Sequence, residues 1–161
     1  MTRHMELNEF LIKEGSKSKY ILDTSVIIKW YSHENEDDLE MAMLFYQQVK
    51  ENQIIIISLD LMVFELLNFF ICRLKLPQDK LSKILSEIYD TIFTINSNKA
   101  LHEEAYEIAN ILKNTIYDSS FVALSVKLQY PLFTADNKLC KSARANGYDV
   151  FHLSDYRQFF N

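Results

Sequence analysis

The chain has 161 residues, of which 48% are hydrophobic and 24% are charged, and its net charge is −5 at pH 7. This length and composition are typical of one globular domain that buries a hydrophobic core. The acidic balance argues against a broad basic surface for nucleic acid, although it leaves room for a small basic groove. No apolar run approaches the ~20 residues that a membrane-spanning helix needs. The N-terminal residues are too polar for a secretory signal, so we expect a cytoplasmic protein with no membrane partner.

The cysteines and histidines do not form a recognisable metal or disulfide pattern. Cys72 and Cys140 are isolated and lack the spacing of a zinc site, so we expect both to be reduced and unbridged. The histidines are scattered as well: His4, His33, His102 and His152. We expect them to be ordinary surface or core residues. The sequence also has no glycine-rich phosphate loop, which argues against binding of a nucleoside triphosphate.

Short apolar runs alternate along the chain with segments of helical periodicity. Strands are predicted at residues 19–23, 54–57, 91–95, 132–134 and 150–153. Helices are predicted at residues 25–32, 37–51, 60–74, 78–90, 98–113, 118–129 and 136–146. Strands separated by helices imply a mostly parallel sheet that is covered on both faces. We therefore predict a single α/β domain with three layers, α/β/α.

The first predicted strand is preceded by residues 1–18, which could contain a short helix that ends near Gly15. We therefore predict three parts: an N-terminal extension over 1–18, the folded domain over 19–156 and a C-terminal tail over 157–161.

Four acidic residues lie in four separate contexts along the chain. Asp23 ends the first predicted strand, Glu65 lies in an apolar helix, Asp118 begins a helix, and Asp136 follows a short apolar run. Strand ends converge on one edge of the sheet in an alternating α/β protein, and sites form at that edge. Acids gathered there would repel one another unless a cation lay between them. A divalent metal with oxygen ligands is the cation that such a cluster predicts.

Three of these acids also have a purely structural interpretation. Asp23, Asp118 and Asp136 each precede a predicted helix, and aspartate is a preferred N-cap residue. Taken one at a time, each could therefore be a helix cap instead of a metal ligand.

Glu65 is harder to explain in this way. It lies with Asn68, Cys72 and Lys75 on one narrow polar stripe of an otherwise apolar helix. The stripe could be a thin solvated edge, but a carboxylate on a mostly buried helix more often has a partner or a metal. The wide apolar circumference would allow this helix to pack on both the sheet and a second subunit.

Several basic residues flank the segments that carry the acids: Lys29, Arg73, Lys75, Lys138, Lys141 and Arg144. Each of them taken singly is expected to be a solvated surface residue, and together they could form a local basic groove.

Four segments in this order resemble the PIN-domain ribonucleases, in particular the VapC-type toxins of prokaryotic toxin–antitoxin pairs. The segments are ILDTSVIIKW, FELLN, YDSSFVALS and LFTADNKL, and the resemblance runs from Tyr20 to Leu153. It implies a PIN-like fold with metal ligands at Asp23, Glu65, Asp118 and Asp136. It also implies hydroxyl groups near the site at Thr24 or Ser25 and at Thr134.

The resemblance further implies an endoribonuclease that uses Mg²⁺ or Mn²⁺ to hydrolyse RNA, with a cognate antitoxin and a homodimeric assembly. Two such ions about 4 Å apart would activate a water and hold the leaving oxygen. We expect Asp23 to be the central ligand, with Glu65 and Asp118 completing one ion site and Asp136 serving the second. Ser25 or Thr134 would orient the carboxylates.

Two features depart from the family pattern. About 18 residues come before the first strand, where VapC-type chains usually begin almost at that strand. Asn137 occupies a position where the family often has a further acid, which would weaken the second ion site.

Two other functions remain open. Some PIN-like domains are non-catalytic RNA-binding or scaffold modules, but these commonly lose one or more of the acids, and this chain has all four. A receiver-like domain that accepts phosphate on Asp23 is another alternative. The sequence lacks the acidic pair after the first strand and the lysine after the last strand that such a domain would need.

Overall fold

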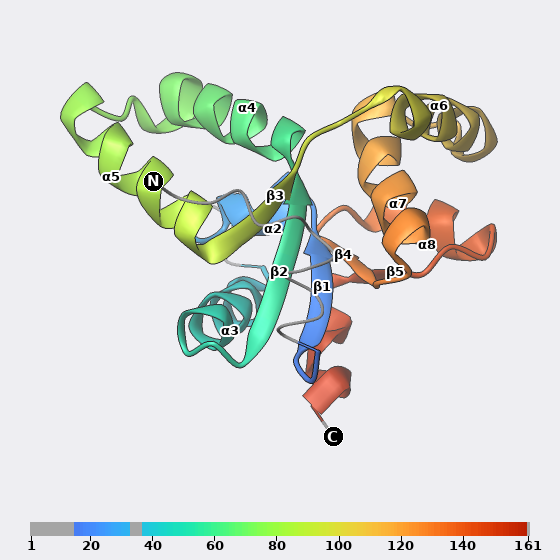
Figure 1. The fold of residues 1–161 in the computed structure, drawn as a ribbon, viewed down its shortest axis with the longest axis horizontal. Helices are drawn as coiled ribbons and strands as arrows, with labels where there is room; N and C mark the ends of the chain where they lie inside the picture. The colour runs from blue at the N-terminus through green and yellow to red at the C-terminus, as the bar shows by residue number, and fades with distance from the viewer. Residues whose placement is uncertain (1–14, 33–36, 161) are drawn as a thin grey trace.

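The computed structural model describes residues 15–32 and 37–160 (Figure 1). Its centre is a sheet of five strands in the order β3-β2-β1-β4-β5. Every neighbouring pair of strands is parallel. The strands are β1 (Ser18–Leu22), β2 (Ile54–Leu59), β3 (Ile92–Ile95), β4 (Leu132–Thr134) and β5 (Val150–His152).

Helices connect the strands and cover both faces of the sheet. They are α2 (Thr24–Ile28), α3 (Leu39–Lys50), α4 (Asp60–Phe69), the π-helix η1 (Phe70–Leu74), α5 (Gln78–Thr91), α6 (Lys99–Leu112), α7 (Ile116–Leu128), α8 (Asn137–Ala145) and the 3₁₀-helix η2 (Leu153–Phe160). In Figure 1, α3 and α5 lie on one side of the strands, and α6, α7 and α8 lie on the other. The predicted three-layer α/β/α fold with a parallel sheet is therefore confirmed.

The core is built on the central strands. All six residues of β2 are buried, which is typical of a parallel strand covered on both faces. β1 pairs with β2 on one side and with β4 on the other, with Ile21 opposite Ile57 and Leu132. Beside β1, the Tyr20 ring packs edge-on against the rings of Phe45 and Phe133. This packing holds β1 and β4 side by side, and both strands lead directly into the site described below.

Most helices begin or end within one or two residues of their predicted bounds, and three of the differences have local reasons. α4 ends at Phe69 and continues as a π-helix, where one regular helix was expected over residues 60–74. α7 begins at Ile116 because Thr115 caps it, two residues before the predicted start. α2 ends at Ile28, and only turns follow it up to Ser32.

The predicted helix of the N-terminal extension falls largely on residues 1–14, outside the described residues, as do His4 and His33. η2 runs through the predicted start of the C-terminal tail, and the three-part division of the chain stays a prediction. The two cysteines are unpaired, with Cys72 exposed and Cys140 buried. Of the helices over 15–32 and 37–160, none combines the length and the apolar character that crossing a bilayer requires.

Candidate active site

The sheet topology defines where a site can form. The strand order reverses at the centre, because β1 leads to β2 on one side while β4 lies on its other side. In open parallel sheets, the crevice beyond the carboxyl ends of the strands at such a switch point is the usual ligand site. Asp23 follows β1 directly, and Asp136 lies just beyond the end of β4. Two of the four predicted acids are thus brought to the same edge by topology alone.

Asp23 is buried and held in a fixed orientation. It is the N-cap of α2, and its Oδ1 accepts hydrogen bonds from the Ser25 backbone N–H at 3.0 Å and from the Ser25 hydroxyl at 2.5 Å. Only 5% of the residue is exposed. The capping interpretation of Asp23 is therefore correct, and it is also compatible with a site role, because the cap uses Oδ1 and the carboxylate still lines a cleft.

Ser25 ties Asp23 to the end of β4. Its Oγ accepts a hydrogen bond from the Ala135 backbone N–H at 2.9 Å and lies 3.4 Å from the Thr134 hydroxyl. The Thr134 hydroxyl in turn accepts a hydrogen bond from the Asp136 backbone N–H at 3.0 Å. The predicted hydroxyl residues thus form one network that joins the ends of the two central strands.

Glu65 reaches the same region from α4. It is half-buried and accepts a short hydrogen bond from the hydroxyl of Thr24, the buried first residue of α2. This bond connects the acid of α4 to the helix that Asp23 caps. Glu65 therefore has a hydrogen-bond partner, as a carboxylate on a largely apolar helix requires.

Asp118 and Asp136 are positioned by two different helix starts. Asp118 is not the cap of α7. Thr115 is the N-cap, and its hydroxyl accepts from the Asp118 backbone N–H and donates to Asp118 Oδ2 at 2.8 Å. Asp136 does cap α8, since its Oδ1 accepts from the backbone N–H groups of Lys138 at 2.7 Å and Leu139 at 3.1 Å. The capping interpretation is thus correct for Asp136 and wrong for Asp118.

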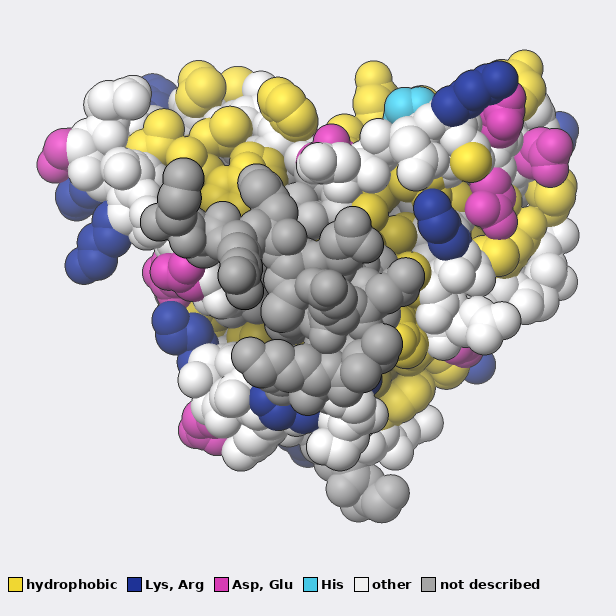
Figure 2. Space-filling view, viewed as in Figure 1, with side chains coloured by type: hydrophobic (Ala, Val, Ile, Leu, Met, Phe, Trp, Pro, Cys, Tyr) yellow, Lys and Arg dark blue, Asp and Glu magenta, His cyan; other side chains and the backbone are white. Residues whose placement is uncertain are grey.

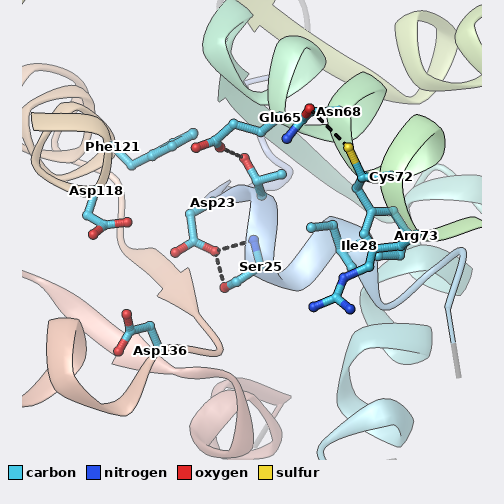
Figure 3. Close-up of a pocket in the computed structure, with 12 residues that line it drawn as sticks. Asp23, Ser25, Ile28, Glu65, Asn68, Cys72, Arg73, Asp118, Phe121 and Asp136 are labelled. Atoms are coloured by element: carbon cyan, nitrogen blue, oxygen red, sulfur yellow. Dashed lines mark hydrogen bonds between the residues drawn. The ribbon is translucent and has the colours of Figure 1, made fainter. Parts of the chain in front are cut away.

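All four acids line one cleft of about 440 Å³. Figure 3 shows Glu65 above, Asp23 in the centre, Asp118 to the left and Asp136 below, with their carboxylates turned toward a common space. Burial decreases across the set: Asp23 is buried, Glu65 and Asp118 are half-buried, and Asp136 is exposed. The same cleft is lined by Thr24 and Ser25, while Thr134 lies behind Ser25.

The electrostatics of the cleft make the carboxylates hard to ionise together. The pKa of Asp23 is raised to about 6: burial is the largest cause, the charge of Asp118 adds to it, and hydrogen bonds from Ser25 and Thr134 oppose it. The pKa of Glu65 is also raised, first by burial and then by Asp118, against the hydrogen bond from Thr24. Asp118 therefore raises the pKa of both Asp23 and Glu65, and a cation in the cleft would relieve this repulsion.

The chemistry of the donor set fits a hard divalent cation with an incomplete protein shell. Carboxylate oxygens are the ligands of Mg²⁺, which typically binds through one or two carboxylates and keeps several waters. Within residues 15–32 and 37–160, no three acidic, histidine or cysteine side chains converge tightly enough to enclose an ion. The open cleft thus fits an ion that is held partly by water, and it does not fit a closed structural metal site.

Several cleft residues were only partly anticipated from the sequence. The predicted polar stripe is correct for Asn68 and Cys72, which line the cleft beside Glu65, but Lys75 does not line it. Arg73 lines the cleft instead. The π-helix explains the exchange, because its wider turn changes which residues follow Glu65 on the same face. Phe121 and Ile28 complete the apolar wall, and nothing in their spacing marked them in advance.

The PIN domain family model matches residues 20–145, so the chain belongs to the PIN domain family. The match runs from Tyr20 in β1 to the end of α8 and includes all four acids. None of the curated proteins compared with the sequence matches it.

Solved structures with the same fold include toxins. PAE2754 from Pyrobaculum aerophilum has a TM-score of 0.62 at 16% identity, and the match covers 86% of this chain and 92% of that one. A toxin–antitoxin complex from Klebsiella pneumoniae has a TM-score of 0.60 at 14% identity, covering 83% and 97%. VapC20 of Mycobacterium tuberculosis, a toxin that cleaves the sarcin–ricin loop, has a TM-score of 0.58 at 12% identity, covering 80% and 95%. At identities of 12–16%, these three structures show that the fold of this chain is shared with them.

Proposed function

We propose that this protein is an endoribonuclease that hydrolyses RNA phosphodiesters with Mg²⁺ or Mn²⁺, and that it is the toxin of a toxin–antitoxin pair. The observation that carries the proposal is the convergence of four acids, from four segments of the chain, on one open cleft of a PIN domain. Burial and the charge of Asp118 raise the pKa of Asp23 and of Glu65, and groups perturbed in this way are concentrated at functional sites.

The metal would be held mainly by Asp23, with Glu65 and Asp118 on either side. Asp136 is exposed and would serve a second ion, directly or through water. When bound, the ions neutralise phosphate charge, activate a water and hold the leaving oxygen. Asn137, which begins α8 beside Asp136, adds no charge to this second position.

The side chains around the acids keep this arrangement rigid. Ser25 holds Asp23 by Oδ1, so the second oxygen of this carboxylate keeps one direction. Thr24 and Thr115 do the same for Glu65 and Asp118. Supporting hydrogen bonds of this kind orient carboxylate ligands without binding the ion themselves.

The activity is tested with purified full-length protein and labelled RNA, in the presence of Mg²⁺ or Mn²⁺ and with a chelator as control. Asp23→Asn and Asp118→Asn should each abolish metal-dependent cleavage while the far-ultraviolet circular dichroism spectrum stays that of the wild type. Asp149→Asn removes the same charge from an exposed position outside the cleft and should cleave normally. Wild-type protein that binds RNA but cleaves none with either metal would instead favour a non-catalytic RNA-binding module.

The toxin role predicts a partner that silences the cleft. An antitoxin would insert a positive side chain between the acids, because a positive charge complements the negative charge of the cleft. A neighbouring reading frame for a short DNA-binding protein with a basic or helical tail would support this role. Expression of the wild type alone should arrest growth, and expression of Asp118→Asn should not.

A homodimer is the assembly that the surface supports. Phe64 on α4 is 69% exposed and Ile71 on η1 is 72% exposed, although both are large apolar residues. Figure 2 shows hydrophobic side chains gathered over α4. A patch of this kind marks an interaction surface. A monomer in size-exclusion chromatography with light scattering at micromolar concentration would count against this part of the proposal.

A further inference from the structure

A second cavity of about 430 Å³ adjoins the acid cleft. We call it the α2–η1 groove and define it by Ser25, Ile28, Lys29, Phe69 and Arg73. Four of these residues, all except Lys29, also line the acid cleft, so the two spaces are continuous. Figure 3 shows Asp118 and Asp136 on one side of Ser25, and Ile28 and Arg73 on the other.

The charge changes sign between the two spaces. Of the described residues that line the α2–η1 groove, none is acidic, whereas two are basic, Lys29 and Arg73. The Lys29 ammonium donates to the Asp37 backbone carbonyl at 2.8 Å, which holds it beside the groove. In a chain with a net charge of −5, this is a local positive site next to a negative one. A polyanion whose cleaved phosphate lay among the acids would need such a site for its neighbouring phosphate.

Arg73 is placed at this site by the π-helix. If α4 continued as a regular α-helix, Arg73 would follow Glu65 by roughly 2.2 turns and would lie about 80° around the axis from it. The π-helix Phe70–Leu74 has more residues per turn, so each residue advances less around the axis. Arg73 is thereby turned back toward the face of Glu65 and Asn68, and all three side chains line the cleft. Single π turns inside helices often occur at functional sites, for this kind of reason.

The guanidinium group of Arg73 is available for a ligand. Arg73 is exposed, and within the described parts of the chain it forms no salt bridge or hydrogen bond. In Figure 3 the group extends past Ile28 toward Ser25, and all three residues line both spaces. A planar guanidinium suits two-point binding of a phosphate, and it carries its charge at every relevant pH.

The groove also has an apolar wall beside Arg73. Phe69 and Ile28 are half-buried and line both spaces. Aromatic side chains beside a basic residue are the usual means of holding a nucleotide base of a single strand, because every base has a flat apolar face.

We propose that the α2–η1 groove binds the nucleotide next to the cleaved bond, with Arg73 binding its phosphate and Phe69 contacting its base. The inference rests on the proposed ribonuclease function and deepens it by assigning a single-stranded RNA path across the site. Arg73 would be a substrate-binding residue that acts beside the acids and does not take part in activating water.

Binding is measured with a fluorescein-labelled single-stranded RNA of about 12 nucleotides and mixed sequence. Asp118→Asn serves as the non-cleaving background, so that Mg²⁺ can be present. Adding Arg73→Ala should weaken binding about tenfold, the effect of one charge-assisted hydrogen-bond pair. It should also reduce the slope of log Kd against log salt by about 0.7, the value for one phosphate of a single strand.

Three comparisons make the test specific. Arg73→Lys keeps the charge and should recover most of the salt slope but only part of the affinity. Lys83→Ala removes a charge from an exposed position of α5 outside both spaces and should bind like the background. In the otherwise wild-type protein, Arg73→Ala should raise KM for the same RNA with a smaller effect on kcat.

Unchanged affinity and salt slope in Arg73→Ala would overturn the proposal, and so would a background protein that binds no RNA. Arg73-dependent binding of a poly-glutamate peptide, with RNA binding unaffected, would assign the groove to an acidic protein partner instead. The two proposals fail separately. Cleavage with normal KM in Arg73→Ala refutes the groove and leaves the nuclease standing, whereas Arg73-dependent RNA binding without any cleavage by the wild type refutes the nuclease and leaves only RNA binding at the groove.

Discussion

Asp23→Asn should stabilise the metal-free protein, although it should destroy activity. The Asp23 carboxyl group has a pKa of about 6 in the folded chain against 3.8 in its unperturbed state, because burial and Asp118 disfavour its charge. At pH 7 the Asp23 carboxyl group is therefore mostly ionised in the folded protein, although its buried surroundings favour the protonated form. This difference in pKa corresponds to about 3 kcal/mol of lost stability.

The sign of this effect defines a pH window. Below pH 3.8 the carboxyl group is protonated in both folded and unfolded chains and costs nothing. As the pH rises from 3.8 to about 6, the unfolded chain releases its proton first, so stability falls and the loss is complete above about 6. Asparagine resembles the protonated acid, and its Oδ1 can still accept the two hydrogen bonds from Ser25.

Thermal unfolding in EDTA measures the effect. At pH 7 we expect Asp23→Asn to gain about 2 to 3 kcal/mol, which raises Tm by roughly 5 to 10 °C for a chain of this size. The gain should shrink toward zero near pH 4. Asp149→Asn, the exposed control, should change stability by less than about 0.5 kcal/mol. A lower Tm for Asp23→Asn in EDTA at pH 7 would show instead that a favourable partner stabilises the ionised carboxylate and that burial does not destabilise it.

Three further predictions concern the groups around the acids. Mg²⁺ at about 100 times its Kd should raise the free energy of unfolding of the wild type, measured in urea, by about 2.7 kcal/mol. Asp23→Asn should lose most of this gain, and an equal gain in the wild type and the variant would show that the ion binds elsewhere. Thr24→Val removes the hydrogen bond that lowers the Glu65 pKa, so the acidic limb of the pH–rate profile should move to higher pH, and an unmoved limb would exclude Glu65 as its source. Thr115→Ala removes the α7 cap and should lower the free energy of unfolding by about 1 kcal/mol. It should also lower the activity, because Asp118 loses the hydrogen bond that orients it, and full activity at a temperature where the variant is folded would show that this orientation does not matter.

The fold and the acids could be predicted from the sequence because their signals are local. The β-branched run Ile54–Ile57 and the alternation of strands with helices lead to a parallel sheet without any knowledge of distant contacts. A parallel sheet in turn brings the residues after its strands to one edge, which is how Asp23 and Asp136 could be placed together.

The rest of the cleft depends on geometry that spacing does not encode. Regular helical periodicity predicts Lys75 on the stripe of Glu65, but the helix widens after Phe69, and Arg73 lines the cleft instead. The cap of α7 is another case. Thr115 and Asp118 are both good N-cap residues, and only the backbone conformation at Thr115 shows which of them caps the helix.

In the proposed function, the acids of the cleft direct metal-dependent hydrolysis of RNA by water. The most direct test is mass spectrometry of the RNA fragments that the purified wild type produces with Mg²⁺. Attack by an activated water leaves a linear phosphate on one new end and no 2′,3′-cyclic phosphate, and these fragments should be absent with Asp118→Asn. Cyclic phosphate ends would show that the 2′-hydroxyl attacks instead of water, and the same fragments from Asp118→Asn would show that the acids of the cleft are not needed for cleavage.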